Sequence, residues 1–95
     1  MSSSESVLDR AWTLAPQVSV RPERFGALLY HFGTRRLSFL KDQRLLTVVE
    51  QLGDVPSARD ACLLAGVDDE AMPSFERALA QLAATDMVRE RAVQL

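Results

Sequence analysis

Apolar residues alternate with polar ones in the first half of the chain and fall at helical spacing in the second half. From Trp12 to Val20 the apolar residues stand at even spacings, with polar residues between the later ones. A period of two places alternate side chains on one face of a strand. This segment therefore predicts one half-buried strand, with Pro16 and Pro22 marking its limits.

The stretch FGALLYHFGTRRLSFL, Phe25 to Leu40, predicts two further strands joined at Gly33 and Thr34. A two-residue loop with glycine in its first position favours a type II′ turn, whose first central residue needs a positive φ. The sequence thus predicts a β-hairpin with a tight turn.

That turn sets the register of the hairpin. It places Tyr30 opposite Leu37 and Leu28 opposite Phe39, so these four side chains share one surface. We expect this surface to face the core. The opposite surface is mixed, and we expect His31 to be solvated on it.

After the hairpin the apolar spacing becomes helical. Asp42 is suited to cap the start of a first helix, and Gly53 can end that helix in a left-handed conformation. Ser57 is suited to cap a second helix, which ends at Gly66. Pro73 belongs in or just before the first turn of a third helix. The apolar positions that define these helices are Leu45, Leu46, Val48, Val49 and Leu52, then Ala58, Ala61, Cys62, Leu64 and Ala65, and finally Met72, Phe75, Leu79 and Leu82.

The order of elements is therefore β-β-β-α-α-α. It predicts an α+β fold of winged-helix-like architecture, with a three-stranded antiparallel meander followed by three α-helices. We place the domain at residues 11–88, a flexible serine-rich tail at residues 1–10 and a C-terminal tail at residues 89–95. In a meander the third strand, residues 35–40, keeps one free edge.

Composition and charge limit the classes of function that this chain can have. The 95 residues suit one domain, and the net charge of -2 supplies no global field to attract nucleic acid or an anionic membrane. The single cysteine, Cys62, cannot form an internal disulfide, and we see no signal peptide or membrane-spanning run. We therefore expect a cytoplasmic protein with no membrane partner, and a monomer or weak homodimer.

The parts needed for catalysis are missing from the sequence. His31 and Cys62 are single residues of their types, so they offer no paired metal ligands or redox pair. The four glycines are dispersed and form no phosphate-binding pattern. We expect His31 to be a solvated neighbour of Arg36 and Cys62 a small buried hydrophobe. We predict no catalytic residue, no metal, no cofactor and no enzymatic activity.

Two other classes of function remain as alternatives. Winged helices commonly bind DNA, and Arg35 and Arg36 could contact phosphate. Between Glu70 and Asp86, however, Arg77 is the one cation among several acids, which has the wrong sign for a DNA groove. Arg35 and Arg36 also suit a charged edge that blunts unwanted strand pairing. A DNA-binding winged-helix protein and a structural subunit of an enzyme complex are the alternatives.

The segment PQVSVRPERFGALLYHFGTRRLSFLKDQRLLTVVEQL, Pro16 to Leu52, resembles the MftB family of mycofactocin peptide chaperones. These belong to the PqqD-like proteins, also called RiPP recognition elements. The resemblance continues through AGVDDE and FERALAQLAATDMV, and covers Trp12 to Val88. Within it, RPERFGALLYHFGTRRLSFLK is specific in content.

The resemblance implies a non-catalytic chaperone that binds the leader of a ribosomally made precursor peptide. The peptide is added as an antiparallel strand and presented to a radical S-adenosylmethionine (SAM) maturase, which acts on the precursor's C-terminal Val-Tyr end. Carried over, the binding strand is Arg35 to Leu40 and the opposite wall is the helix from about Phe75 to Thr85.

The resemblance also implies which residues bind the peptide. Core packing accounts at least as well for Leu37, Phe39, Leu79 and Leu82, and solvation for the three arginines. The residues are Arg35, Arg36, Leu37, Ser38, Phe39, Leu40, Phe75, Arg77, Ala78, Leu79 and Leu82.

Overall fold

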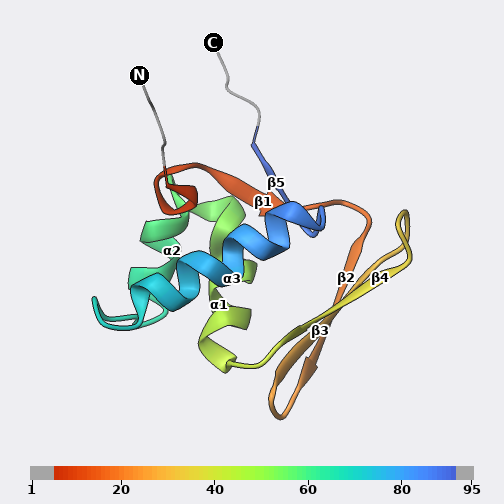
Figure 1. Cartoon of the computed structure of the whole chain (residues 1–95), viewed down its shortest axis with the longest axis horizontal. Coiled ribbons are helices and arrows are strands. Elements are labelled where there is room, and N and C mark those ends of the chain that lie inside the picture. The colour runs from red at the N-terminus through yellow and green to blue at the C-terminus, as the bar shows by residue number, and fades with distance from the viewer. Residues whose placement is uncertain (1–5, 92–95) are drawn as a thin grey trace.

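The computed structural model describes residues 6–91. A three-stranded antiparallel sheet precedes three α-helices, which confirms the α+β class (Figure 1). The elements in chain order are the 3-10 helix η1 (Val7–Asp9), β1 (Trp12–Leu14), β2 (Val18–Glu23), β3 (Gly26–His31), β4 (Arg36–Leu40), α1 (Gln43–Gln51), the 3-10 helix η2 (Leu52–Asp54), α2 (Ala58–Leu64), α3 (Met72–Ala84) and β5 (Val88–Glu90).

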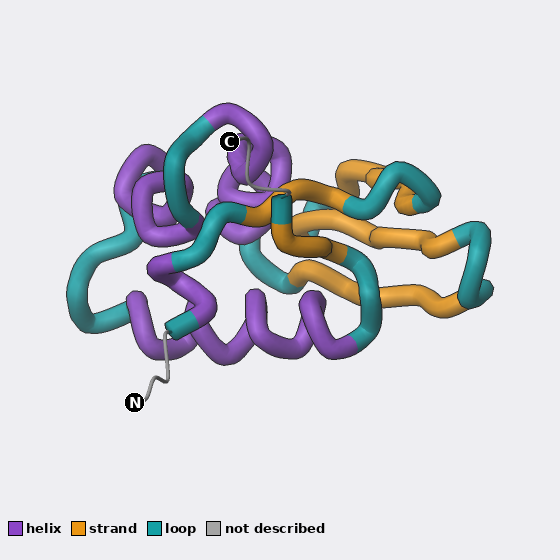
Figure 2. The backbone as a smooth tube through the Cα atoms, turned by 90° about the horizontal axis from the view of Figure 1, so that it is seen from above, coloured by secondary structure: helices purple, strands orange, loops and turns teal. Residues whose placement is uncertain are grey.

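The three-stranded sheet, in the order β2-β3-β4, extends to one side of the helices. Figure 2 shows this sheet at one end of the molecule and most of the helical part at the other. The sheet thus projects as a single wing, and the winged-helix description fits only loosely.

The turn between β3 and β4 differs from the predicted type II′ turn. It contains residues 32–35, and Arg35, with a φ of 63°, takes the left-handed conformation expected of Gly33. Nδ1 of His31 stabilises this shape by accepting backbone N–H bonds from Gly33 and Thr34, at 3.0 and 3.1 Å. Because the observed and predicted loops are centred on the same two residues, the predicted register is confirmed.

The face of the sheet that packs on the helices is the opposite of the predicted one. Leu29 and Leu40 are almost completely buried and His31 is 4% exposed, whereas Leu37 and Phe39 are more than half exposed. Both faces of the hairpin carry apolar residues, so their pattern alone does not select one. The helices select it, since α1 follows β4 directly and packs against β3.

Gly26 permits the close approach of β3 to the start of α1. Its φ is 150°, and a Cβ atom there would lie 2.0 Å from the carbonyl oxygen of Leu40 and 2.9 Å from the amide nitrogen of Asp42. Only glycine fits this position without a backbone shift.

The segment predicted as one strand forms two. β1 ends at Leu14, Pro16 and Gln17 form a turn, and β2 continues through Pro22. β1 pairs with β5, with Leu14 opposite Val88. The prediction failed because this partner lies more than 70 residues away along the chain. Pro22 is tolerated because β2 is an edge strand of its sheet.

The described parts of the two predicted tails, residues 6–10 and 89–91, contain ordered structure. Leu8 in η1 is buried, and the indole N–H of Trp12 donates to a backbone carbonyl of η1 at 2.8 Å. Near the other end, the Arg91 guanidinium donates to carbonyl oxygens of η2 and of the loop after it. These contacts join distant segments, which local composition does not reveal. Residues 1–5 and 92–95 of the predicted tails lie outside the described residues.

The helices begin and end largely as predicted. Asp42 caps α1, Ser57 caps α2, and Gly66, with a φ of 85°, follows α2. Gly53 does not end α1 in a left-handed conformation, because it lies inside η2, which prolongs the helix. Within residues 6–91, no helix is long and apolar enough to cross a membrane. The predicted buried stripe of α3 is confirmed at Met72, Phe75, Leu79 and Leu82.

Candidate functional site

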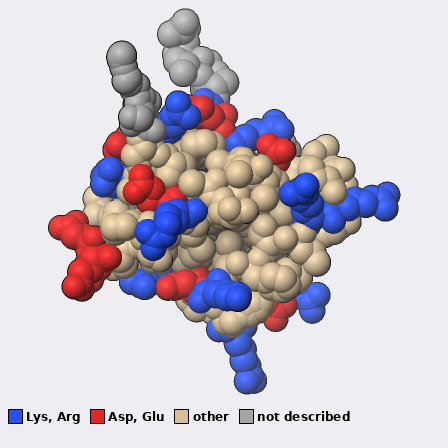
Figure 3. Space-filling model, in the orientation of Figure 1, with Lys and Arg blue, Asp and Glu red and all other residues tan. Residues whose placement is uncertain are grey.

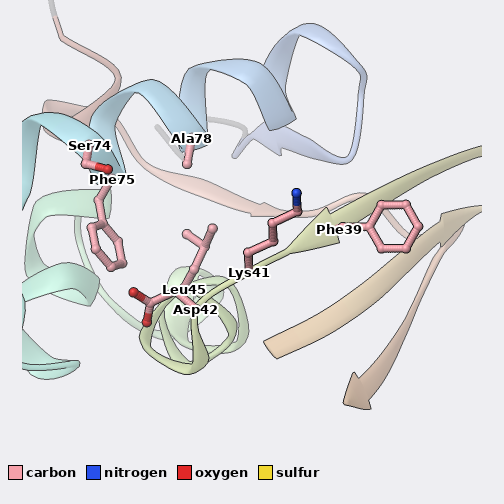
Figure 4. Close-up of a pocket in the computed structure, with 7 residues that line it drawn as sticks. All are labelled: Phe39, Lys41, Asp42, Leu45, Ser74, Phe75 and Ala78. Carbon is pink, nitrogen blue, oxygen red and sulfur yellow. The ribbon is translucent and has the colours of Figure 1, made fainter. Parts of the chain in front are cut away.

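A groove runs between β4 and α3, with the first turn of α1 at its base. It consists of two adjoining hollows of about 250 and 350 Å³, and Phe39, Leu45 and Ala78 line both. The smaller hollow is completed by Leu37, Ser38, Leu40, Gln81 and Leu82, and the larger (Figure 4) by Lys41, Asp42, Ser74 and Phe75.

The chain connection explains how the groove forms. Only Lys41 and Asp42 separate β4 from α1, so Leu45 in the first turn of α1 lies at the end of the strand. Figure 4 shows Ala78 directed from α3 into the space above Leu45. The small Ala78 side chain leaves room between strand and helix that a larger residue would fill.

The hydrogen-bond pattern of the sheet decides which backbone groups of β4 face the groove. The carbonyl of His31 accepts the N–H of Arg35 at 2.7 Å, on the β4 side, whereas Phe32 donates at 2.8 Å to Gln17, on the β2 side. In an antiparallel ladder this direction alternates from residue to residue. Residues 27, 29 and 31 of β3 therefore face β4.

The partners of those three residues on β4 are Arg36, Ser38 and Leu40, so their N–H and C=O groups point back to β3. The backbone groups of Leu37 and Phe39 consequently point away from the sheet. β4 is the last strand of its sheet, and the structure describes no further strand on this side. An extended segment can pair with β4 here through main-chain hydrogen bonds.

The larger hollow is polar where it meets α1. Asp42 accepts bonds from Nε and Nη2 of Arg44, at 3.3 and 3.1 Å, and this pairing holds the pKa of Asp42 below its ordinary value. The same guanidinium lies 5.1 Å from the centroid of the Phe75 ring.

Lys41 lines the same hollow, and in Figure 4 its side chain rises beside β4 toward α3. Among residues 6–91 it forms no ion pair, and the adjacent Asp42 is paired with Arg44. The hollow therefore offers one cation to an acidic ligand.

Most of the predicted site residues meet at this groove, and four do not line it. Arg35 and Arg36 lie exposed at the end of the hairpin, Arg77 is exposed on α3, and Leu79 is buried in the core. The predicted residues that do line the groove are Leu37, Ser38, Phe39, Leu40, Phe75, Ala78 and Leu82.

Sequence reasoning missed part of the groove. Asp42 and Leu45 were assigned only to the first helix and Lys41 was given no role, although their position directly after β4 was a signal that they border its end. Gln81 lies within the predicted helical wall but was not named as a binding residue, and Ser74 lies just before that wall.

The residues considered for chemistry lie elsewhere. Cys62 is fully buried, as predicted, and desolvation raises the pKa of its thiol to about 11. The imidazole of His31 is buried in the hairpin and engaged with the turn through Nδ1. The described residues include no group of three or more His, Cys, Asp or Glu side chains that could hold a metal ion.

Comparison with known proteins identifies the family. The sequence model of the peptide chaperone MftB family matches residues 11–89, which is most of the chain. The chain belongs to the peptide chaperone MftB family. Members of this family are named peptide chaperones. In this structure the groove lies beside the open edge of β4.

Curated relatives agree with this assignment. The protein named peptide chaperone MftB from Mycobacterium tuberculosis is 56% identical over 89 residues, which cover 94% of this chain and 82% of the relative. Its counterpart from Mycobacterium ulcerans is 56% identical over 80 residues, covering 84% and 73%. The counterpart from Mycolicibacterium smegmatis is 51% identical over 80 residues, covering 84% and 78%. No solved structure gave a significant match.

Proposed function

We propose that this chain binds the leader of a ribosomally made precursor peptide as an antiparallel strand on β4. It then presents the peptide to a radical SAM maturase in mycofactocin biosynthesis, and catalyses no reaction itself. Membership of the MftB family supports the role of peptide chaperone. The observation that carries the binding mode is the open edge of β4, with the backbone groups of Leu37 and Phe39 directed into the groove.

Strand addition divides affinity and specificity between different groups. Main-chain hydrogen bonds to β4 supply affinity for many extended sequences, and the two hollows accept alternate peptide side chains. The smaller hollow is lined mainly by apolar residues, whereas the larger contains Lys41. We expect the leader to place an apolar residue in the smaller hollow and an acidic residue near Lys41 in the larger one.

A proline substitution tests this mode directly. Leu37→Pro removes an N–H that points into the groove, so it should abolish binding of a synthetic leader peptide while the sheet remains folded. Leu37→Ala is the matched control, because it shortens the same side chain and keeps the N–H. Titration calorimetry measures the leader affinity, and circular dichroism verifies the fold of each variant.

Ser38→Pro supplies the opposite control. The N–H of Ser38 points to β3, so this substitution should destabilise the hairpin instead of removing only the peptide contact. A folded Leu37→Pro variant that binds the leader as tightly as Leu37→Ala would refute strand addition on β4. Chemical-shift mapping with the leader offers a second check, because the largest changes falling on α2, far from the groove, would also refute strand addition on β4.

A further inference from the structure

The face of the sheet turned away from the helices is apolar and open. Its centre consists of Leu28 and Tyr30 on β3, which are half-buried, and Leu37 and Phe39 on β4. The exposed fractions are 63% for Phe32, 59% for Phe39, 54% for Leu37 and 42% for Phe25. A concentration of large exposed apolar side chains on one face indicates an interaction surface.

The aromatic side chains on this face are organised by contacts with one another. The ring centroids of Phe25 and Phe39 lie 6.2 Å apart, and those of Tyr30 and Phe32 lie 5.1 Å apart in an edge-to-face arrangement. Such pairs restrict the rings before any partner binds. The surface is therefore partly preorganised.

The segment that forms this face is rich in cations. Residues 18–41 contain five cations and one carboxylate, Glu23, so they carry a net charge of +4, whereas the whole chain carries -2. The carboxylate is itself paired with Arg21 at 3.0 Å. Figure 3 shows blue at the ends of the sheet and a red cluster at the opposite end of the molecule. The cations are Arg21, Arg24, Arg35, Arg36 and Lys41.

This charge favours an acidic partner over a second copy of the chain. Two such faces brought together would oppose like charges, which is costly at an interface. A partner whose apolar patch is bordered by carboxylates would complement both the rings and the arginines.

The face is continuous with the groove proposed to hold the peptide. Phe39 belongs to the face and also lines both hollows. A strand added to β4 would place alternate side chains on this face beside Leu37 and Phe39. A bound peptide would thus widen the apolar face by one strand.

We propose that the outer face of β3 and β4 docks the peptide-modifying enzyme through an acid-bordered apolar patch on that enzyme. The enzyme contacts the face and the added peptide strand as one surface. This proposal rests on the proposed function, since the bound leader completes the surface. The enzyme should then bind the chaperone–leader complex more tightly than the free chaperone. Because the two binding events are thermodynamically linked, bound enzyme increases the affinity for the leader by the same factor.

The test uses Phe32→Ser, in an exposed turn, and Tyr30→Thr, on β3, one strand away from the groove. Each should weaken binding of the purified maturase by about tenfold or more and leave leader affinity within about twofold of wild type. The matched control is Leu63→Ser with Leu64→Ser, which removes exposed apolar side chains from α2, 56% and 67% exposed, and should change neither affinity. Added salt should weaken enzyme binding.

Titration calorimetry with and without leader separates the outcomes. Unchanged enzyme affinity in a folded Phe32→Ser variant overturns docking on this face, even if the leader binds. Loss of leader affinity in that variant assigns the face to the peptide instead. If wild type forms a dimer that the variant does not, the face binds a second copy of the chain. If wild type binds anionic vesicles and the variant does not, the face binds a membrane. A wild-type chain that does not bind the leader refutes the proposed function itself.

Discussion

At the scale of single residues, Asp42 connects helix stability with the shape of the groove. Its carboxylate accepts the N–H of Arg44 at 2.8 Å and pairs with the guanidinium of the same residue. That guanidinium also lies against Phe75 on α3. One carboxylate thus caps α1, lines the larger hollow and holds the Arg44 guanidinium beside Phe75, which lines the same hollow.

Replacing Asp42 with alanine should lower the free energy of unfolding by about 1 kcal/mol at neutral pH, because the N-cap acceptor is lost. Asp42→Asn keeps an acceptor and should retain most of the cap. The pKa of Asp42 is lower in the folded state than in the unfolded state. Its negative charge therefore stabilises the fold at pH values above the unfolded-state pKa, and this stabilisation is lost as the pH falls through the folded-state pKa. Urea unfolding at about pH 7 and about pH 2 should show the difference between wild type and Asp42→Asn shrinking in acid. A difference independent of pH would exclude a contribution from the ionised carboxylate.

At the scale of elements, the pairing of β1 with β5 ties the two ends of the described chain together. Three residue pairs form the ladder, from Trp12 opposite Glu90 to Leu14 opposite Val88. The side chain of Arg91 extends this connection by donating to carbonyl oxygens at Gly53 and Val55. The pair therefore fastens the segment after α3 to the end of α1.

Arg91→Ala should lower the free energy of unfolding by about 1–2 kcal/mol, because two carbonyl groups lose a charged donor. Arg89→Ala is the matched control, since Arg89 lies exposed on β5 and forms no ion pair within residues 6–91. Denaturant unfolding of both variants gives the comparison. Equal losses would mean that the Arg91 contacts contribute nothing beyond a surface charge.

At the scale of the whole molecule, charge and chemistry are distributed unevenly. Residues 18–41, which contain the three-stranded sheet, carry a net charge of +4, whereas the rest of the sequence carries -6. The one thiol is buried away from the groove, and the one imidazole is engaged with the β3–β4 turn. A molecule built in this way can bind and orient a peptide, but the groove presents neither side chain to it.

Precursor peptide incubated with this protein alone should keep its mass. Cys62→Ala should still support the partner enzyme, because a thiol with a pKa of about 11 holds almost no thiolate near neutral pH. The cavity left by the substitution costs some stability, so the variant is compared where it remains folded. His31→Ala is a poorer probe than its predicted exposure implied, since it removes an acceptor for two turn amides. Mass spectrometry provides the readout, and a mass change without the enzyme would contradict the chaperone role.

Much of the local structure was predictable because it depends on near neighbours along the chain. The spacing of apolar residues predicts α1, α2 and α3, and Asp42, Ser57 and Gly66 mark their ends correctly. The register of the hairpin follows from the position of its turn, even though the turn itself is of another kind. The β4 edge was predictable from the order of the strands, whereas the apolar residues of the groove, apart from Leu45, were named from the family resemblance.

The tertiary structure alone decided which face of the hairpin is buried. Leu29 and Leu37 are equally apolar, and alternation assigns them to opposite faces without ranking those faces. Burial follows from the path of the chain after Leu40, where Gly26 allows α1 to approach β3. The β1–β5 pair was likewise invisible to local patterns, because its partners are separated by most of the chain. Periodicity records which side chains share a surface, whereas burial depends on what the rest of the chain places against it.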